Sequence, residues 1–374
     1  MTGSHTINIK IKKNINIIKN TLSIILINLK NIVIKMIENK LEIMIPTYNR
    51  YKYLDRTLNF ILNSPFKNCK ITVQDNASND DTPYVCKKYL NLFKNLHIIR
   101  HDVNIGGNAN IVRCYEEATA KYIWVIADND ILKFNDCEDF IEAIISEKYD
   151  LILCSSGNYM EINDSNKIDN GLNNIIKEKS NNEKNYLENS AESLISKIGK
   201  YYFSITLFIP SVIYKTSLID SQTIIEMYDY ISRSFPHMAL SAKVVNENLL
   251  TYSTKKDIVL IQTNPTKYDI EALNLYSRRL NSSFLLNNAK YRSYVGESPK
   301  GGILYEAIAH TIVSKAQNEK NNKLYFADMI NNIYKIKGFF KGLLYVIPLK
   351  ILFYLVPKKI CSYIVNKNNE NKGN

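Results

Sequence analysis

The sequence predicts an α/β protein with a mostly parallel β-sheet, helices on both sheet faces and a helical C-terminal extension. Short apolar runs alternate with segments of helical periodicity from Leu41 to Cys154, which is the pattern of right-handed β–α–β units. The run Tyr122–Ala127 is continuously apolar, as expected for a central strand buried on both faces. From Tyr268 to Ala316 helical patterns dominate.

The predicted elements follow one another regularly from Leu41. Strands are expected where short apolar runs are bounded by turn residues, at Leu41–Ile45, Cys69–Gln74, Leu96–Arg100, Tyr122–Ala127 and Leu151–Cys154. Helices are expected between them, at Tyr53–Leu62, Thr82–Leu92, Asn108–Ala118 and Cys137–Ser146. Pro46 is expected to stop the first strand, because its nitrogen carries no hydrogen for a sheet hydrogen bond.

The regular alternation ends at Glu161–Ser190, a stretch rich in Asn, Lys, Ser and Glu that predicts a long mobile loop or insertion. Helix and strand patterns return from Ala191 to about Gln262. We therefore expect one domain over residues 41–265, with halves at 41–155 and 156–265, and a helical region over residues 266–374.

Both ends of the chain carry apolar segments interrupted by charge. In residues 1–40, Thr21–Ile37 has helical spacing, so the extension is either an amphipathic helix or a non-native leader before a true start at Met36. Neither this stretch nor Gly338–Val365 contains the about 18–20 uninterrupted apolar residues of a spanning helix. Lysines and tyrosines among Leu, Ile and Phe in residues 338–365 predict an interfacial segment on an anionic membrane, and a helix packed on the domain is the alternative.

The composition limits the class of partner. A net charge of +12 indicates an anionic partner. We expect no nucleic-acid partner, because the lysines are spread among Asn and Ile rather than gathered in a basic arm. The six cysteines show no metal-binding spacing, and the N-terminal stretch lacks a signal-peptide cleavage site, so a cytoplasmic protein with reduced cysteines is expected.

Polar residues follow the predicted strands, at the edge where open α/β sheets bind ligands. After the first strand, Tyr48 offers a ring on which a base can stack, and Arg50 offers a planar donor for phosphate. Asp75 ends the second strand and can accept hydrogen bonds from a base edge or a ribose hydroxyl. In the third loop, Asn104–Asn110, glycines allow close backbone approach and asparagines offer hydrogen bonds.

The fourth strand ends in Asp128-Asn129-Asp130. Two carboxylates one residue apart repel each other unless a cation lies between them. Mg²⁺ usually binds through one or two carboxylates together with substrate phosphates. The motif therefore indicates an enzyme whose substrate is a nucleotide or a nucleotide-sugar.

Four motifs in this order resemble the family 2 glycosyltransferases, which have the GT-A (Rossmann-like) fold. They are IPTYNR (45–50), VQDNASNDDT (73–82), NIGGNAN (104–110) and YIWVIADND (122–130). The resemblance covers roughly Leu41–Ser155 and is greatest to the abequosyltransferase-like subgroup, which acts on O-antigen and related surface glycans. It implies a nucleotide-sugar half at 41–155 and an acceptor half at 156–265.

The resemblance also implies roles for individual residues. The nucleotide-sugar donor would be bound by Pro46, Thr47, Tyr48, Arg50, Asp75, Asn76, Asn104, Gly106, Asn110 and Asp128. Asp128 and Asp130 would hold Mn²⁺ or Mg²⁺ against the diphosphate. His237 stands where the family has a carboxylate base and is the candidate base, with Asp229 as the main alternative, followed by Glu226 and Glu247.

The implied reaction is an inverting sugar transfer to a glycan or lipid-linked glycan at the cytoplasmic face of a bacterial inner membrane, by a protein peripheral to that membrane. Two rivals remain. A nucleotidyltransferase would need a Gly-rich phosphate loop after the first strand, which IPTYNR lacks. A membrane-associated binding or assembly protein could retain a degenerate transferase fold without catalysis.

Overall fold

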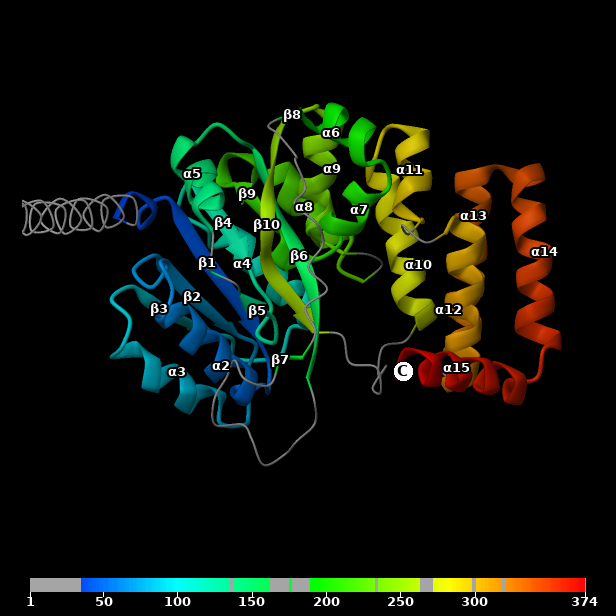
Figure 1. Ribbon diagram of the computed structural model, residues 1–374, viewed down its shortest axis with the longest axis horizontal. Helices are drawn as coiled ribbons and strands as arrows, with labels where there is room; N and C mark the ends of the chain where they lie inside the picture. The colour runs from blue at the N-terminus through cyan, green and yellow to red at the C-terminus, as the bar shows by residue number, and fades with distance from the viewer. Residues whose placement is uncertain are drawn as a thin grey trace, which may run out of the picture.

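The computed structural model describes residues 35–132, 134, 137–161, 175–176, 189–232, 235–262, 272–297, 301–317 and 321–373. Figure 1 shows two parts side by side. A central sheet with helices on its faces forms one part, and the helices coloured yellow to red form the other.

The sheet has the strand order β3-β2-β1-β4-β9-β6-β10-β5. In that order the strands are Leu96–Arg100, Lys70–Asp75, Leu41–Thr47, Tyr122–Val125, Val212–Lys215, Leu151–Glu161, Leu250–Gln262 and Ile131–Leu132. Strands β3, β2, β1 and β4 pair in parallel, and β9 is antiparallel to both β4 and β6. Strand β10 runs parallel to β6. Two short strands, β7 (Ile175–Ile176) and β8 (Asn189–Ser190), pair with β6 and β10. The predicted mostly parallel sheet is confirmed.

Helices cover both faces of the sheet, as predicted. One face carries α2 (Tyr51–Leu62), α3 (Thr82–Leu90) and α5 (Glu138–Ser146). The other carries α4 (Gly107–Glu116), α6 (Ala191–Ile198), α7 (Tyr201–Thr206), α8 (Ser221–Asp229) and α9 (Met238–Asn246). Short 3₁₀ turns lie at Ile209–Ser211, Thr216–Leu218 and Ser283–Leu285.

Burial on both faces explains why the central strands are continuously apolar. In β1, Ile43 and Ile45 pack into the core under α2 and α3, whereas Met44 packs into the core under α4. Adjacent residues of β4 point to opposite faces in the same way. Trp124 packs into the core under α2 and α3, and Val125 packs into the core under α4. Successive side chains point to opposite faces, so a strand covered on both sides needs apolar residues at every position.

The prediction that Pro46 ends the first strand is wrong by two residues. Strand β1 continues to Thr47, with Pro46 opposite Gln74 and Thr47 opposite Asp75. Pairing with β4 ends at Met44, so the missing N–H of Pro46 falls on the side where no strand remains to accept it. The side chain of Thr47 is thereby aligned with the ends of the other strands.

Strand β6 is longer than predicted, because it continues beyond Cys154 through Ser155, Ser156 and Gly157 to Glu161. Its partner β10 pairs with it as far as Tyr159, and these ladder hydrogen bonds extend a strand that its polar sequence alone does not indicate. Of the predicted insertion at 161–190, only Glu161, β7 and β8 lie within the described residues. The predicted N-terminal helix lies outside them except for Lys35–Ile37, which are helical.

The predicted helical C-terminal region is confirmed. Its helices are α10 (Ala272–Ser282), α11 (Ala289–Val295), α12 (Ile303–Gln317), α13 (Asn322–Lys337), α14 (Phe339–Leu355) and α15 (Lys358–Gly373). Four of them, α10, α12, α13 and α14, enclose a core of their own. In the part of the chain described, no single helix is long and apolar enough to cross a membrane; α14 with Lys358–Lys367 meets the test only as a pair bent by 104°. The domain limits at 155 and 265 stay predictions.

Candidate functional site

The four predicted motifs meet at one edge of the sheet, where β1, β2, β3 and β4 end. The loops after β1 and β2 are joined, because Asn49 N donates to Ser78 Oγ at 2.9 Å. Strand β1 is joined to the turn after β4 by a hydrogen bond from Thr47 Oγ1 to Asp128 Oδ2 at 2.8 Å. Segments up to 81 residues apart in sequence thus form one continuous polar edge.

Asp128 is buried among donors. Its Oδ1 accepts from Arg50 Nη1 at 2.9 Å and its Oδ2 from Thr47, while its backbone oxygen accepts from Thr57 Oγ1 at 2.9 Å. Burial raises the pKa of Asp128, and the positive charge and hydrogen bond of Arg50 oppose that rise. Both carboxylate oxygens of Asp128 therefore have protein partners.

Asp130 lies in a different environment although it is only two residues away. Its side chain is 6% exposed. Burial and the neighbouring charge of Asp128 raise its pKa to about 7, with partial opposition from Arg56 and Arg50. This carboxylate thus carries a negative charge that its surroundings compensate poorly.

The carboxylate oxygens at this turn are suitable ligands for a divalent cation. Carboxylate oxygens are the ligands of Mg²⁺, and a cation beside Asp130 would relieve the repulsion that raises its pKa. Among the described residues no group of three or more His, Cys, Asp or Glu side chains forms a metal site. A cation held by Asp130 and Asp128 would therefore take its remaining ligands from phosphate and water, as Mg²⁺ commonly does.

Asp75, the predicted base-binding residue, is engaged within its own loop. Its Oδ1 accepts from Ser78 N at 3.0 Å and its Oδ2 pairs with Arg100 Nη1. Arg100 Nη2 also donates to Ser78 O at 2.7 Å. Arg100 was not among the predicted site residues, although it ends the predicted third strand; it lies opposite Asp75 in the β2–β3 register.

The predicted asparagines shape the loop between β3 and α4. Asn76 Nδ2 donates to Asn104 Oδ1 at 2.8 Å, and the same oxygen accepts from Gly106 N at 2.8 Å. Asn110 is buried, with Nδ2 donating to Gln74 O at 2.9 Å and Oδ1 at 2.9 Å from His101 Nε2. These side chains hold the backbone of the loop, and contact with a donor stays a prediction for each.

Arginine and aromatic side chains border the carboxylates. Tyr48 is 42% exposed. The guanidinium carbons of Arg50 and Arg56 lie 5.5 and 5.4 Å from the centroid of the Tyr53 ring. Arg56 Nη2 also donates to Asn129 O at 2.9 Å. Arg56 was missed by the sequence analysis; its spacing of three residues from Tyr53, on one helix face, was the available signal.

The two candidate bases lie in contrasting environments. His237 is fully buried; its Nε2 is 3.1 Å from Thr206 O, and burial lowers its pKa to about 4. Asp229 is exposed at the end of α8. Asn108 Nδ2 donates to Ile231 O at 2.6 Å, which brings this end of α8 beside the β3–α4 loop. The assignment of the base stays a prediction. Exposure favours Asp229, because a base must come into contact with the acceptor hydroxyl.

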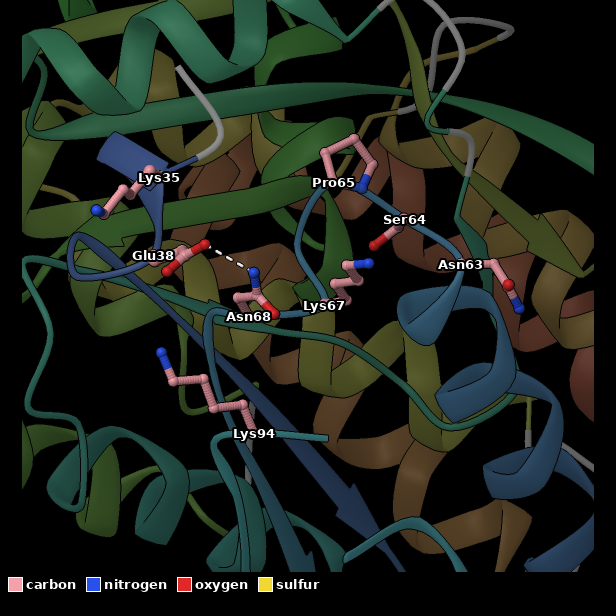
Figure 2. A pocket seen from close by; sticks show the side chains of 8 residues that line it. All are labelled: Lys35, Glu38, Asn63, Ser64, Pro65, Lys67, Asn68 and Lys94. Carbon is pink, nitrogen blue, oxygen red and sulfur yellow. Dashed lines mark hydrogen bonds between the residues drawn. The ribbon is translucent and has the colours of Figure 1, made fainter. Parts of the chain in front are cut away.

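A separate pocket of about 590 Å³ lies at the opposite edge of the sheet, before β1, β2 and β3 begin (Figure 2). Lys35, Lys67 and Lys94 line it, and Asn68 Nδ2 donates to Glu38 Oε1 at 2.7 Å. It contains none of the predicted site residues, so we assign it no role in the chemistry of the other edge.

Comparison with known proteins gives one family match. Residues 42–191 match the model of glycosyl transferase family 2. The chain is 33% identical over 114 residues to abequosyltransferase RfbV of Salmonella typhimurium, covering 29% of this chain and 34% of that protein. It is 32% identical over 97 residues to the GalNAc(5)-diNAcBac-PP-undecaprenol beta-1,3-glucosyltransferase of Campylobacter jejuni, covering 25% and 30%. The matched stretches thus span about a third of these relatives.

A solved structure matches over nearly the full length. The S. aureus TarS 1-349 structure in complex with UDP-GlcNAc aligns with a TM-score of 0.54 and 16% identity, covering 89% of this chain and 90% of that one. At this identity the likeness concerns the fold. It includes the helical C-terminal region, which the family model does not reach.

Proposed function

This chain belongs to the family 2 glycosyltransferases, which it joins through residues 42–191, and we propose that it is an inverting glycosyltransferase. In this proposal it moves a sugar from a nucleotide-sugar to a hydroxyl of a glycan acceptor. The observation that carries the proposal is the buried pair Asp128 and Asp130 at the sheet edge, bordered by Thr47 and Arg50.

The donor would lie across the ends of β1, β2 and β4. The exposed ring of Tyr48 can stack on the base, and Arg100, paired with Asp75, can donate to acceptors on the base edge. Arg50 keeps about half of its side chain exposed, so its remaining N–H groups can turn to a diphosphate. Pro46 and the Asn76–Asn104 pair would fix the shape of the pocket.

Asp130 and Asp128 would hold Mn²⁺ or Mg²⁺. When bound, such a cation supplies Lewis-acid stabilisation of the departing nucleoside diphosphate. Asp128 shares its carboxylate between Thr47 and Arg50, so Asp130 is the carboxylate with more freedom to bind the metal.

The acceptor hydroxyl would be deprotonated at the end of α8. We assign this role to the exposed Asp229 in preference to His237, because a base must come within hydrogen-bond distance of the hydroxyl. Attack from the face opposite the leaving group gives inversion in a single displacement. In that case His237 has a structural role, linking the start of α9 to the carbonyl of Thr206.

The relatives suggest the class of acceptor. The name of the Salmonella relative describes an abequosyltransferase, and that of the Campylobacter relative describes transfer to an undecaprenol-linked glycan. We infer that this chain acts on a lipid-linked oligosaccharide of a bacterial surface glycan, from the cytoplasmic side of the inner membrane.

A second candidate is a binding protein that keeps the fold without turnover. It is favoured by the burial of His237 and by the engagement of Asp75 and Asp128 with protein partners. The two candidates differ in one measurable property, the release of nucleoside diphosphate.

The experiment screens UDP-, GDP-, CDP- and dTDP-sugars by thermal shift with Mn²⁺, and then measures diphosphate release from the stabilising donor. A transferase should release diphosphate with a requirement for Mn²⁺ or Mg²⁺, and Asp130→Ala should reduce the rate at least about 100-fold. The control is Asp55→Asn, which removes an exposed carboxylate of α2 that pairs with Lys88 of α3. It should keep the wild-type rate. Donor binding without release would favour the binding protein.

A further inference from the structure

Helix α14 exposes a continuous row of large apolar side chains on its outer face. We call this row the apolar stripe; its residues are Phe340, Leu344, Ile347, Ile351, Tyr354 and Leu355. Their exposed fractions run from 50% at Ile351 to 84% at Phe340. From Phe340 to Tyr354 the spacing is four, three, four and three residues, and Leu355 lies four residues after Ile351, so all six fall on one side of the helix.

The apolar stripe is not the core-facing side of α14. Gly342, Val346, Leu349 and Phe353 are buried on the opposite side, and the last three belong to the core shared with α10, α12 and α13. Helix α14 is therefore apolar on both sides, and the described residues cover only one of them. A monomer in water rarely leaves a row of this size exposed unless it binds something.

The exposed apolar surface continues into α15. Ile360 and Tyr363 are 49% and 65% exposed. Figure 1 shows α14 as the outermost upright helix and α15 crossing beneath the C-terminal helices. The strand arrow of β10 points to the side on which α15 lies. Because β10 runs parallel to β6, which has the direction of β1 and β4, the site edge and α15 face the same side of the molecule.

The charges around the apolar stripe identify the chemistry of its partner. At about 100° per residue, Lys341 falls on one flank of the stripe and Lys350 on the other. Lys358 and Lys359 follow at the start of α15, and residues 339–365 contain no Asp or Glu. An apolar row with basic side chains on both flanks matches an interface between acyl chains and anionic headgroups, because lysine stems can extend along the row and place their ammonium groups among phosphates.

The face is held rigidly by the rest of the helical region. Lys315 of α12 donates from Nζ to the backbone oxygens of Leu352 and Val356, at 3.2 and 2.6 Å. These are carbonyls at the end of α14, which have no partner within the helix. Phe353 stacks on Phe326 of α13 with ring centroids 4.0 Å apart. The apolar stripe is thus preformed and needs no folding on contact.

We propose that the apolar stripe and the exposed side of α15 bind the surface of an anionic lipid bilayer, with α14 lying along the surface without crossing it. The contact does not depend on the proposed transfer chemistry. The contact would keep the sheet edge with Asp128 and Asp130 on the side of the protein that faces lipid-linked substrates.

The test is cosedimentation of the full chain with vesicles of phosphatidylcholine, with and without phosphatidylglycerol. Wild-type protein should bind the anionic vesicles at least about tenfold more strongly than the neutral ones. Leu344→Glu/Ile351→Glu/Leu355→Glu should lose at least about tenfold in binding. The matched control, Tyr84→Glu/Leu90→Glu/Leu92→Glu, changes three exposed apolar residues near α3 and should bind as wild type.

A second variant, Lys341→Gln/Lys350→Gln, changes only exposed side chains and decides the matter if the glutamate variant misfolds. It should weaken binding to anionic vesicles severalfold and leave binding to neutral vesicles unchanged. Unchanged binding of this variant or of a folded glutamate variant would overturn the proposal. The proposal would also be overturned if the wild-type protein formed a dimer without lipid and the glutamate variant were a monomer, because a second copy would then cover the stripe. Diphosphate release should survive in every variant, which separates this test from that of the proposed function.

Discussion

At the residue scale, the protein compensates the negative charge of Asp128 well and that of Asp130 poorly. Arg50 and Thr47 donate to both oxygens of Asp128. Burial and the charge of Asp128 raise the pKa of Asp130 to about 7. Arg50 therefore acts as an internal cation for Asp128, and a metal would complete the compensation at Asp130.

The raised pKa of Asp130 makes the stability of the metal-free protein depend on pH. The unfolded carboxyl has a pKa of about 3.9, and the folded one of about 7. Between these values the folded state binds more protons than the unfolded state, so the free energy of unfolding falls as pH rises from about 4 to about 7. Asp130→Asn removes this loss and should be more stable than wild type at pH 8, by about 1–4 kcal/mol.

Urea unfolding in a chelator at pH 5 and pH 8 measures this difference. The gain of Asp130→Asn should be larger at pH 8 than at pH 5. Asp55→Asn, which removes an exposed carboxylate from the same region, should show no such growth with pH. A variant less stable than wild type at pH 8 would mean that Asp130 is stabilised in its charged form by groups other than a metal.

Arg50→Gln should lower stability by about 1–3 kcal/mol, because it leaves the buried carboxylate of Asp128 without its cation. The same variant should respond more strongly to Mn²⁺, since the metal no longer competes with a guanidinium. Melting temperatures with and without Mn²⁺ test both effects. Arg113→Gln, on an exposed pair with Glu116, should change neither. An equal or smaller Mn²⁺ shift in Arg50→Gln would argue against a cation at this pair.

At the element scale, strand ends decide where the chemistry lies. Strands β1 and β2 end in register, with Thr47 opposite Asp75, and β3 places Arg100 opposite the same carboxylate. The loops that follow are tied to each other by side-chain hydrogen bonds, so the position of one loop fixes the next. The sheet thus delivers four short motifs to one edge before any ligand is present.

The parallel strands and the motifs that follow them could be predicted from the sequence, because burial on both faces leaves a strong apolar signal in β1, β2 and β4. The placement of β9 between β4 and β6 could not, since a four-residue strand carries no record of its partners. The same reason applies within the site. Asp128 and Asp130 are separated by a single residue and were recognised from the sequence, whereas Arg100 and Arg56 reach the site only through strand register and helix face. The contact of His237 with the carbonyl of Thr206, 31 residues away, likewise leaves no local signal in the sequence.

The loop between β3 and α4 requires glycine at one of its two glycine positions. Gly106 has φ 88° and ψ 149°, a conformation that other residues rarely adopt, and a Cβ added there would meet no atom within 4 Å. Gly106→Ala should therefore cost about 1–3 kcal/mol through backbone strain alone. Gly107→Ala is the matched control: it also faces open space, begins α4 without a positive φ, and should be neutral or slightly stabilising.

Denaturant unfolding of the two variants gives the comparison. Donor affinity, measured by titration, should fall with Gly106→Ala, because Gly106 N also donates to the Asn104 oxygen that holds the loop. Equal stability of the two variants would show that the loop relaxes without strain and is not held in this form.

At the scale of the whole molecule, the chain has cores on either side of the sheet and a further core within the C-terminal helices. Polar contacts join the parts: Asn246 Nδ2 of α9 donates to Leu285 O at 2.9 Å, and Arg278 of α10 lies 5.2 Å from the Phe235 ring. Phe235 is two residues from His237, so the helical region borders the start of α9. Helix α14 packs on α13 and α13 packs on α10, so a series of packed helices lies between the apolar stripe and the start of α9.

The separate C-terminal core predicts that damage to it stays local. Phe353→Ala removes a ring that is 7% exposed and stacked on Phe326, and should cost about 3–4 kcal/mol. Amide hydrogen exchange should become faster in α12, α13 and α14, while the amides of β1 and β4 keep their wild-type rates, because their cores share no residue with the damaged one. Leu344→Ala, on the exposed side of the same helix, should change neither. Faster exchange throughout the sheet of Phe353→Ala would show instead that the two parts unfold as one cooperative unit.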